Sequence, residues 1–215
     1  MTEHYRDVRC AYDTVAEDYA ARLPDTRAEA PLDLAMVDAF AAAVSADDDP
    51  RVLDAGCGAG RMSRYLIDRG CLVEGVDLSP GMVAMARRDL PDLDFAVASL
   101  TALPYPDRQF AGVMLWYSII HTPPSGLERV VKETARIVRP GGHVLVGFQS
   151  GSGSRDLSAA YRRLGHEVRL ERYRYLADEV AVLLRASGLQ EVSRLVRAPQ
   201  GVETDSQAVL LARAG

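Results

Sequence analysis

The chain has 215 residues, of which 48% are hydrophobic and 26% charged, and its formal net charge is −5. These values are typical of a globular protein with one hydrophobic core, and we expect residues 1–215 to form a single domain. The acidic balance argues against a nucleic-acid partner, and no apolar run approaches the ~20 residues that span a bilayer.

Two amphipathic helices are predicted before residue 50. The first covers residues 3–22 and ends before Pro24, because apolar and tyrosine side chains recur there at helical spacing. The second runs from residue 31 to 45, with Met36, Phe40 and Val44 on one stripe. An acidic loop then leads to residue 51.

A strand, a glycine-rich turn and a helix follow between residues 51 and 68. The turn carries Gly56, Gly58 and Gly60, and Asp54 precedes it. Glycine lets the backbone approach a ligand and adopt positive φ. The helix after the turn is expected to direct unpaired N–H groups and the positive end of its dipole at the crevice. This order predicts the first half of a nucleotide-binding βαβ unit.

The spacing also restricts the ligand. Arg61 stands where a dinucleotide fingerprint has its last glycine, and the turn has no lysine of the kind that a phosphate-binding P-loop needs. The next strand, residues 72–76, is followed by Asp77, about where a carboxylate reaches a ribose. We therefore predict a nucleoside without a pyrophosphate, although Asp77 could instead cap a helix or face solvent.

At this point the chain resembles a known family. Residues 52–60 are similar to motif I, and residues 76–82 to the second motif, of class I S-adenosylmethionine-dependent methyltransferases, in particular the small-molecule, UbiE-like branch. The resemblance implies an α/β fold: a doubly wound, seven-stranded, mostly parallel sheet with strand order 3-2-1-4-5-7-6 and lid helices within residues 1–46. It also implies S-adenosyl-L-methionine as cofactor, released as S-adenosyl-L-homocysteine.

The same resemblance implies the cofactor contacts. Tyrosines of the lid helix would donate to the methionine carboxylate, unless they only pack. Asp77 would bind the ribose hydroxyls, and Ser99 occupies the place of an acidic residue that usually binds the adenine amino group. The full predicted set is Tyr12, Tyr19, Asp54, Gly56, Gly58, Gly60, Asp77, Leu78, Met82, Ser99, Leu100 and Trp116.

The chemistry of the acceptor is expected beyond the fourth strand, residues 112–116. His121 follows that strand at its ligand-facing end and is the predicted general base; the alternative is that it caps or packs on the next helix. His166 is a second choice, whereas His4 and His143 are expected to be peripheral. The next helix is expected to end at Pro140-Gly141-Gly142, before a fifth strand at 143–148.

The last third of the chain is less regular. Residues 150–175 are rich in arginine and tyrosine and are predicted to form a substrate-cap insertion. Its arginines either form a solvated face or bind a carboxylate or phosphate of the acceptor. Strands near 189–196 and 207–212 are expected to close the sheet as an antiparallel pair, which a nicotinamide-binding domain would not have.

These patterns predict an enzyme that methylates an O, N or C atom of a small molecule, anionic or aromatic, by in-line displacement. A nicotinamide-dependent oxidoreductase and a non-catalytic S-adenosylmethionine-binding protein stay open as alternatives. No side chains are spaced as metal ligands, and Cys10, Cys57 and Cys71 indicate reduced thiols in the cytoplasm. The acceptor's identity and the oligomeric state are left open.

Overall fold

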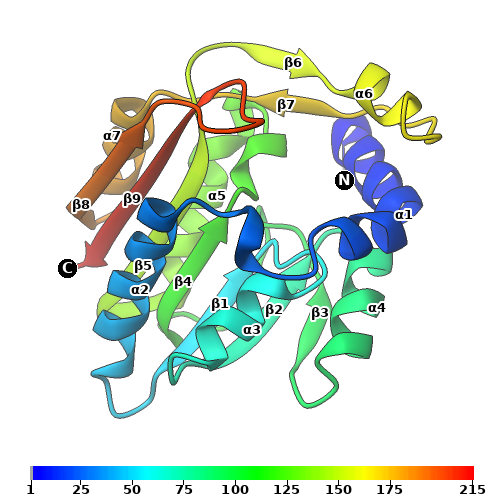
Figure 1. Ribbon diagram of the computed structural model, residues 1–215. Helices are drawn as coiled ribbons and strands as arrows, with labels where there is room; N and C mark the ends of the chain where they lie inside the picture. Colours follow the sequence, from blue (N-terminus) through cyan, green and yellow to red (C-terminus); the bar gives the residue numbers. More distant parts are fainter. Residues whose placement is uncertain (1) are drawn as a thin grey trace.

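The computed structural model describes residues 2–215, and the strands of its main sheet place the site. These strands are β1 (Arg51–Ala55), β2 (Leu72–Asp77), β3 (Phe95–Val97), β4 (Phe110–Trp116), β5 (Val138–Ser150), β8 (Leu189–Arg197) and β9 (Ser206–Ala214). They form one sheet in the order β3-β2-β1-β4-β5-β9-β8 (Figure 1). β1 to β5 pair in parallel, and β9 pairs antiparallel with both of its neighbours.

This topology confirms the predicted strand order. The last two strands are numbered β9 and β8 instead of 7 and 6 because two short strands precede them in the chain. These are β6 (Ser154–Asp156) and β7 (Glu171–Tyr173), which pair with each other outside the main sheet. Because consecutive parallel strands extend outward from β1 in both directions, the order reverses between β1 and β4. A crevice is expected at that point, outside the carboxyl ends of the strands.

Helices cover both faces of the sheet. They are α1 (Glu3–Arg22), α2 (Pro31–Ser45), α3 (Arg61–Ile67), α4 (Pro80–Asp89), α5 (Pro124–Ile137), α6 (Ser158–Arg162) and α7 (Ala177–Ala186). α2 and α3 pack on one face, where Phe40 and Leu66 join the core cluster of Met114. α5 and α7 pack on the other face, in the cluster that contains Leu115. All seven residues of β4 are buried, as expected of a central parallel strand.

The fifth strand starts earlier than the sequence predicted. β5 begins at Val138 rather than His143, and it contains the Pro-Gly-Gly segment that was expected to separate helix from strand. Phe110 pairs with Val138 before the register shifts, so that Gly112 pairs with His143. The glycines accommodate this irregularity: a Cβ on Gly142 would lie 2.7 Å from the carbonyl oxygen of Ala111.

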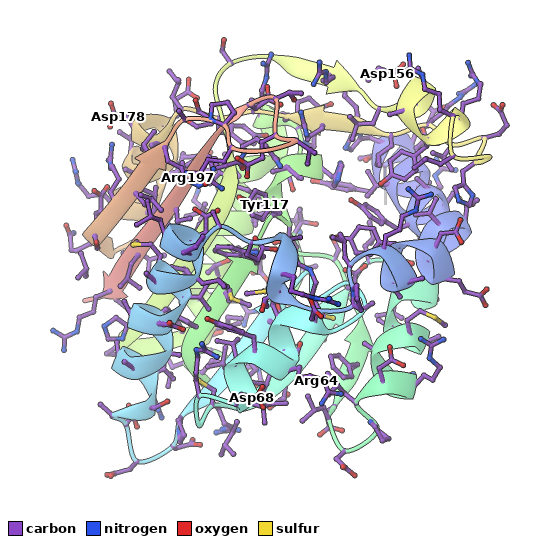
Figure 2. The ribbon with its side chains drawn as sticks, viewed as in Figure 1. Arg64, Asp68, Tyr117, Asp156, Asp178 and Arg197 are labelled. Carbon is purple, nitrogen blue, oxygen red and sulfur yellow. The ribbon has the colours of Figure 1, made fainter. Side chains whose placement is uncertain are left out.

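A buried ion pair ties α2 to the edge of the sheet. The guanidinium of Arg197 in β8 donates to both carboxylate oxygens of Asp33 and to both of Glu203. The side chains of Arg197 and Asp33 are 5% and 1% exposed. Figure 2 shows Arg197 and Tyr117 within the body of the molecule, whereas Asp178 and Asp156 lie at its margin.

Two segments lie over the carboxyl ends of the strands. α1 lies over one part of these strand ends, and the β6–β7 ribbon lies next to α1 together with α6 (Figure 1). The segment 150–175 is therefore more regular than its sequence suggested, because Leu157 and Tyr175 are fixed by main-chain hydrogen bonds to Leu170 and Gln149. Among residues 2–215, no helix is long and apolar enough to cross a membrane.

Candidate active site

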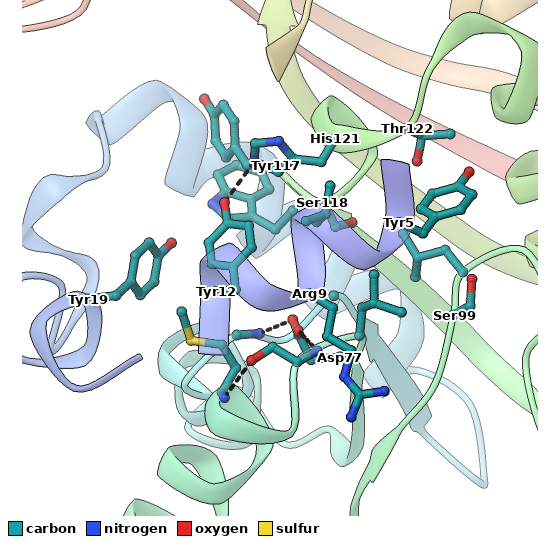
Figure 3. A pocket seen from close by; sticks show the side chains of 18 of the residues that line it. Tyr5, Arg9, Tyr12, Tyr19, Asp77, Ser99, Tyr117, Ser118, His121 and Thr122 are labelled. Atoms are coloured by element: carbon teal, nitrogen blue, oxygen red, sulfur yellow. Dashed lines mark hydrogen bonds between the residues drawn. The ribbon is translucent and has the colours of Figure 1, made fainter. Parts of the chain in front are cut away.

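A cavity opens at the carboxyl ends of β1, β2 and β4, between these strands and α1 (Figure 3). Its empty space is about 850 Å³, a figure that includes the part open to solvent. The predicted site residues that line it are Tyr12, Tyr19, Gly56, Gly58, Asp77, Leu78, Met82, Ser99, Leu100, Trp116 and His121.

The glycine turn forms the floor of the cavity. Gly56 and Gly58 have φ of +84° and +54°, which other residues rarely adopt. A Cβ on Gly56 would lie 2.2 Å from the Cβ of Ser118, so β4 and the turn can approach closely only with glycine there. The N–H groups of Gly56 and Cys57 donate to the Val76 carbonyl, which ties the start of the turn to β2.

Asp77 ends β2 at the rim of this floor. Its Oδ2 accepts the N–H of Gly58 and its Oδ1 accepts the N–H of Ser79, both at 2.9 Å. The pKa of Asp77 is raised because burial penalises the charged form, which outweighs the effect of these hydrogen bonds. A carboxylate has about four acceptor positions, so two stay available for a ligand.

Two predicted residues lie outside the main cavity. Asp54 is 1% exposed and accepts the hydroxyl of Ser63 at 2.6 Å. It lines a smaller neighbouring cavity, and burial raises its pKa to about 6. Gly60 begins α3 with φ of +85°, and a Cβ there would meet Leu90 at 3.1 Å. A side chain at Gly60 would therefore disturb the packing of α3 against α4. Gly60 does not line the main cavity.

The segment after β3 lines the far end of the cavity. Ser99 lies there with Leu100, but its hydroxyl is engaged with Thr101, 2.8 Å from the side-chain oxygen of that residue. This contact uses part of the hydrogen-bonding capacity of the hydroxyl, and the role of Ser99 at the adenine stays a prediction. Leu78 and Met82, which follow Asp77, supply apolar walls on the adjacent side.

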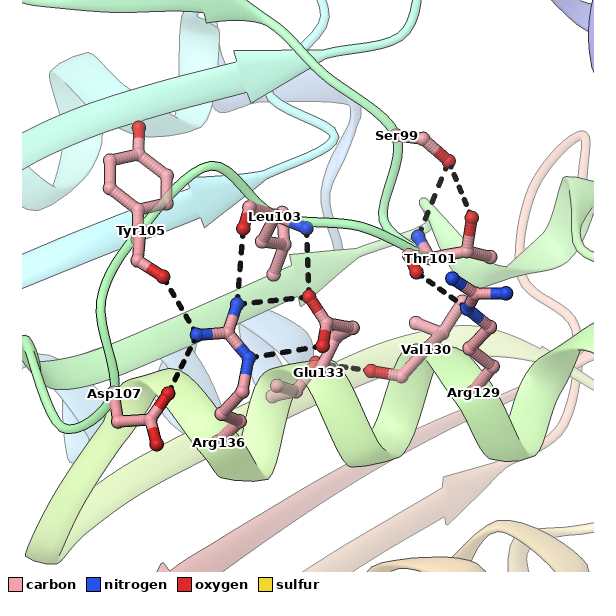
Figure 4. A network of polar contacts seen from close by, with 10 residues as sticks. Ser99, Thr101, Leu103, Tyr105, Asp107, Arg129, Val130, Glu133 and Arg136 are labelled. Atoms are coloured by element: carbon pink, nitrogen blue, oxygen red, sulfur yellow. Dashed lines mark hydrogen bonds and ion pairs between the residues drawn. The ribbon is translucent and has the colours of Figure 1, made fainter. Parts of the chain in front are cut away.

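A polar network fixes this segment to α5 (Figure 4). Arg136 donates to the carbonyl oxygens of Leu103 and Tyr105 at 3.0 and 2.7 Å, and also to Glu133. Glu133 in turn accepts the N–H of Leu103 at 2.9 Å. Arg129 holds the carbonyl of Thr101 at 2.8 Å. Four side-chain contacts of this kind make the wall at 99–101 rigid without any strand.

α1 is attached to α4 across the mouth of the cavity. Asp13 accepts the hydroxyl of Ser79 at 2.6 Å and the N–H of Gly81 at 2.9 Å. Gly81 permits this contact, since a Cβ there would lie 3.2 Å from Ala16. Tyr12, one residue before Asp13, is directed toward His121 within the cavity (Figure 3).

Tyr19 lies nearer the glycine turn, beside Arg61. Arg61 forms an ion pair with Glu29, and both side chains are largely buried. The pKa of Tyr19 is raised because burial disfavours the phenolate, and the positive charge of Arg61 offsets this in part. The Tyr19 ring packs edge-on to that of Tyr12, with centroids 6.0 Å apart.

His121 lies in a short 3-10 helix, η2 (Ile119–His121), and is 7% exposed. Its Nε2 is 2.7 Å from the hydroxyl of Tyr12, and its Nδ1 is 2.8 Å from the carbonyl oxygen of Glu171. Burial lowers the pKa of His121 to about 4. His4, which was expected to be peripheral, donates from Nε2 to the His121 carbonyl at 2.7 Å, so that expectation is wrong.

Tyr117 is the main feature that the sequence did not indicate. It has φ of +53°, an unusual conformation for a bulky residue and a common mark of functional sites. Its hydroxyl donates to Gln207 at 2.8 Å, which holds the ring beside Trp116 in the cavity wall. Tyr5 and Arg9 also line the cavity; their helical spacing from Tyr12 is the signal that could have found them.

The arginines of the segment 150–175 are committed elsewhere. Arg155, Arg172 and Arg174 converge on Asp205, which lies in the loop before β9. His166 pairs with Asp18 of α1 at 2.7 Å. No residue of 150–175 lines the cavity. Within residues 2–215, no group of three or more His, Cys, Asp or Glu could hold a metal ion.

Comparisons with known proteins agree with this geometry. Residues 52–142 match the family described as "Methyltransferase domain". Malonyl-[acyl-carrier protein] O-methyltransferase of Enterobacter lignolyticus is 31% identical over 159 residues, which cover 74% of this chain and 62% of the relative. The chain is thus similar to methyltransferases, and residues 52–142 carry the part that matches the methyltransferase domain.

Two further matches place this methyltransferase domain among its relatives. Demethylmenaquinone methyltransferase of Renibacterium salmoninarum is 34% identical over 106 residues, 48% of this chain and 43% of the relative. The chain thus covers less than two thirds of the length of either curated relative. The crystal structure of Burkholderia thailandensis 1,6-didemethyltoxoflavin-N1-methyltransferase, with bound 1,6-didemethyltoxoflavin and S-adenosylhomocysteine, has a TM-score of 0.71 at 24% identity. It covers 99% of this chain and 89% of its own, and it confirms the fold.

The matched region separates two parts of the site. The methyltransferase domain at 52–142 contains the glycine turn, Asp77, Ser99 and His121. α1, with Tyr12 and Tyr19, and the β6–β7 ribbon lie outside that region.

Proposed function

We propose that this chain transfers a methyl group from S-adenosyl-L-methionine to an O, N or C atom of a small-molecule acceptor, with S-adenosyl-L-homocysteine as product. One observation carries the proposal: the carboxylate at the end of β2, Asp77, and the buried His121 line the same cavity. The cofactor supplies an electrophilic sulfonium methyl group. The protein's task is then to bind, to align and to accept a proton.

The residues at the β2 end suit the adenosine part of the cofactor. Asp77 has free acceptor positions on both oxygens, which match two neighbouring ribose hydroxyls. Gly56 and Gly58 leave the floor beside it without side chains. Leu78 and Met82 provide apolar surface for the adenine ring, and Met82 adds a polarizable sulfur. A bound pyrophosphate does not suit this floor, since the N–H groups of Gly56, Cys57 and Gly58 already donate to Val76 and Asp77.

The residues at the β4 end suit the acceptor. Trp116, Tyr117 and Tyr12 supply aromatic walls, which favours an aromatic acceptor. Holding acceptor and methyl in line can lower the barrier by ~7–11 kcal/mol, so alignment by these walls is the larger contribution. General-base help adds ~10²–10⁴-fold. His121 provides the basic nitrogen, because its lowered pKa keeps the ring neutral at pH 7.

The relatives support this class of reaction. The two relatives are named as methyltransferases, one of them an O-methyltransferase, and the structural neighbour holds S-adenosylhomocysteine together with 1,6-didemethyltoxoflavin. We infer that residues 1–46 act as a lid and that 150–175 acts as a substrate cap by packing on α1 rather than by lining the cavity, in one domain. The contacts of Asp13 and His166 with other elements support this division.

Calorimetry followed by a radiolabel assay tests the proposal. The full chain is expected to bind S-adenosylhomocysteine and to transfer labelled methyl to members of a panel of phenols, amines and heteroaromatic compounds. Binding without turnover would favour a non-catalytic cofactor-binding protein. Absence of binding, together with reduction of a nicotinamide cofactor at 340 nm, would favour an oxidoreductase and contradict the proposal.

A further inference from the structure

A hydrogen-bonded chain leads from the cavity through two side chains to β7. The hydroxyl of Tyr12 is 2.7 Å from Nε2 of His121, and Nδ1 of His121 is 2.8 Å from the carbonyl oxygen of Glu171 (Figure 3 shows the first of these contacts). A carbonyl oxygen can only accept, so Nδ1 must carry a hydrogen. β7 thereby sets the tautomer of a histidine that is 50 residues away in the chain.

The surroundings of His121 keep the ring neutral. It is 7% exposed, and no carboxylate oxygen contacts it among the hydrogen bonds of residues 2–215. The charged and titratable groups that face it are His4 from α1 and Arg172 from β7, and both disfavour a second positive charge there. A neutral ring with hydrogen on Nδ1 has its lone pair on Nε2. The proton in the Tyr12–His121 bond therefore belongs to Tyr12.

The direction of that bond changes what Tyr12 can offer to a ligand. A phenol has one proton, and here it is given to His121. The oxygen lone pairs of Tyr12 are left for the cavity. The pKa of Tyr12 is raised well above its usual value, mainly by burial and further by Tyr161, Tyr19 and Asp77, while Arg172 offsets this in part, so the free phenolate is strongly disfavoured. Tyr12 cannot at the same time donate to the methionine carboxylate, and that contact is left to Tyr19.

We propose that Tyr12 is the catalytic residue that meets the acceptor, that His121 positions it and takes its proton, and that the acceptor's nucleophilic atom carries a hydrogen. This deepens the proposed function and rests on it. The acceptor is then a hydroxyl compound or a primary or secondary amine. A tertiary amine, which has no hydrogen to give to the Tyr12 oxygen, is excluded as the preferred class.

The proton transfers balance the reaction. The bond from the nucleophilic atom to the methyl carbon forms as the carbon–sulfur bond breaks, and that atom loses its hydrogen to the Tyr12 oxygen. Tyr12 releases its own proton to Nε2 of His121. Tyr12 is a neutral phenol before and after the step, and the positive charge of the sulfonium ends on the His121 ring, where the Glu171 carbonyl stabilises it. The proton then leaves to solvent, because the pKa of His121 is about 4.

The fold holds Tyr12 in place for this role. Its ring packs edge-on to His121, with centroids 5.3 Å apart, and edge-on to Tyr19 at 6.0 Å. The next residue, Asp13, anchors α1 to Ser79 and Gly81. The rotamer of Tyr12 is therefore constrained on three sides without any contribution from a ligand.

Nitrogen NMR on the full chain tests the hydrogen-bonded chain without a substrate. His121 is identified as the set of ring signals lost in His121→Gln. In the wild-type chain at pH 7 we expect the tautomer with hydrogen on Nδ1. In Tyr12→Phe we expect the same tautomer, but with the Nε2 signal shifted to the position of a ring nitrogen that accepts no hydrogen bond. An Nε2–H tautomer, or a protonated ring at pH 7, would overturn the proposal. This result does not depend on whether the chain methylates anything.

Kinetics with paired amines test the substrate class. Tyr12→Phe is expected to lower kcat by about 10²-fold on a secondary amine and by about twofold or less on the matching tertiary amine, with the affinity for S-adenosylhomocysteine unchanged within about twofold. Tyr65→Phe, which removes a surface contact with Asp38, is the matched control and should behave as wild type.

The outcomes separate the two proposals. Equal losses on both amines, or a tenfold loss of cofactor affinity in Tyr12→Phe, would assign Tyr12 to cofactor binding and overturn the proton path. Failure of the wild-type chain to bind S-adenosylhomocysteine would instead contradict the proposed function, while the NMR result would still decide the tautomer.

Discussion

Replacement of Asp77 gives the most direct measure of how the cavity holds a nucleoside. Gly58 and Ser79 each occupy one acceptor position on its two oxygens, at 2.9 Å, and one position per oxygen faces the ligand. A hydrogen bond to a charged group contributes about 1.5–3 kcal/mol. Two such bonds therefore contribute about 3–6 kcal/mol, and Asp77→Ala is expected to weaken binding by about 10²–10⁴-fold.

S-adenosylhomocysteine is the ligand of choice for this measurement, because it binds without turnover. Calorimetry at pH 7.5 compares wild type, Asp77→Ala and Asp77→Asn. The asparagine variant retains one acceptor oxygen and is expected to fall between the other two. Asp92→Ala removes the same charge from the exposed loop before β3 and serves as the control.

The result that would refute this reasoning is specific. If folded Asp77→Ala bound the ligand within about twofold of wild type, the carboxylate would be no ribose ligand, and its role would be limited to fastening the turn to α4. A circular dichroism spectrum and a thermal melt of each variant establish that the protein is folded before affinities are compared.

Three further predictions concern stability. Asp54 has its pKa raised from 3.8 to about 6 by burial, so its neutral form favours folding: that contribution is present below pH 3.8 and is lost as the pH rises through 6. The free energy of unfolding of Asp54→Asn, measured relative to wild type, should therefore increase by up to about 3 kcal/mol between pH 4 and pH 7. A difference between the two proteins that is the same at both pH values in urea unfolding would contradict this. Arg197→Met leaves buried carboxylates unpaired and should lower the free energy of unfolding by about 3–5 kcal/mol. Arg194→Met at the surface should lower it by about 1 kcal/mol or less. Equal urea midpoints for the two variants would show that the buried network does not stabilise the fold. Gly56→Ala places a Cβ at a positive φ and 2.2 Å from the Cβ of Ser118. It should lower the free energy of unfolding by about 2–5 kcal/mol, which is measured as a lower Tm. Adding Ser118→Gly to this variant should restore part of the lost stability.

The parts of the site that were predictable are those encoded by local patterns. The turn at 56–60, the carboxylate at 77 and the apolar β4 each follow from a few neighbouring residues whose spacing has one structural solution. The strand order followed from the resemblance to a family and from the alternation of strands and helices. These features depend little on what the rest of the chain does.

The parts that were missed depend on contacts between distant residues. Nothing near His4 indicates that it contacts the carbonyl of a residue 117 positions later. The pairing of Arg172 with Asp205 likewise joins a ribbon to a loop 33 residues away. Tyr117 has an ordinary sequence context, which indicates neither its positive φ nor its hydrogen bond to Gln207, 90 residues later. Such contacts are set by tertiary packing, which propensity and spacing do not contain.

Burial of Asp77 at the main cavity and of Asp54 at the smaller neighbouring cavity has an energetic cost that the proposed ligand would offset. Asp54 and Asp77 both have raised pKa values because burial disfavours their charge, and the charge of Asp77 raises the pKa of Asp54 further. Apolar residues of similar size at these positions would make a more stable fold. A ligand with a positive charge and two hydroxyl groups compensates one acid by attraction and the other by hydrogen bonds. S-adenosylmethionine, with its sulfonium, its amino group and its ribose, has this combination, whereas S-adenosylhomocysteine lacks the sulfonium. The proposed cofactor should therefore bind more tightly than its product, and the acids that destabilise the empty fold would contribute to release of the product after transfer.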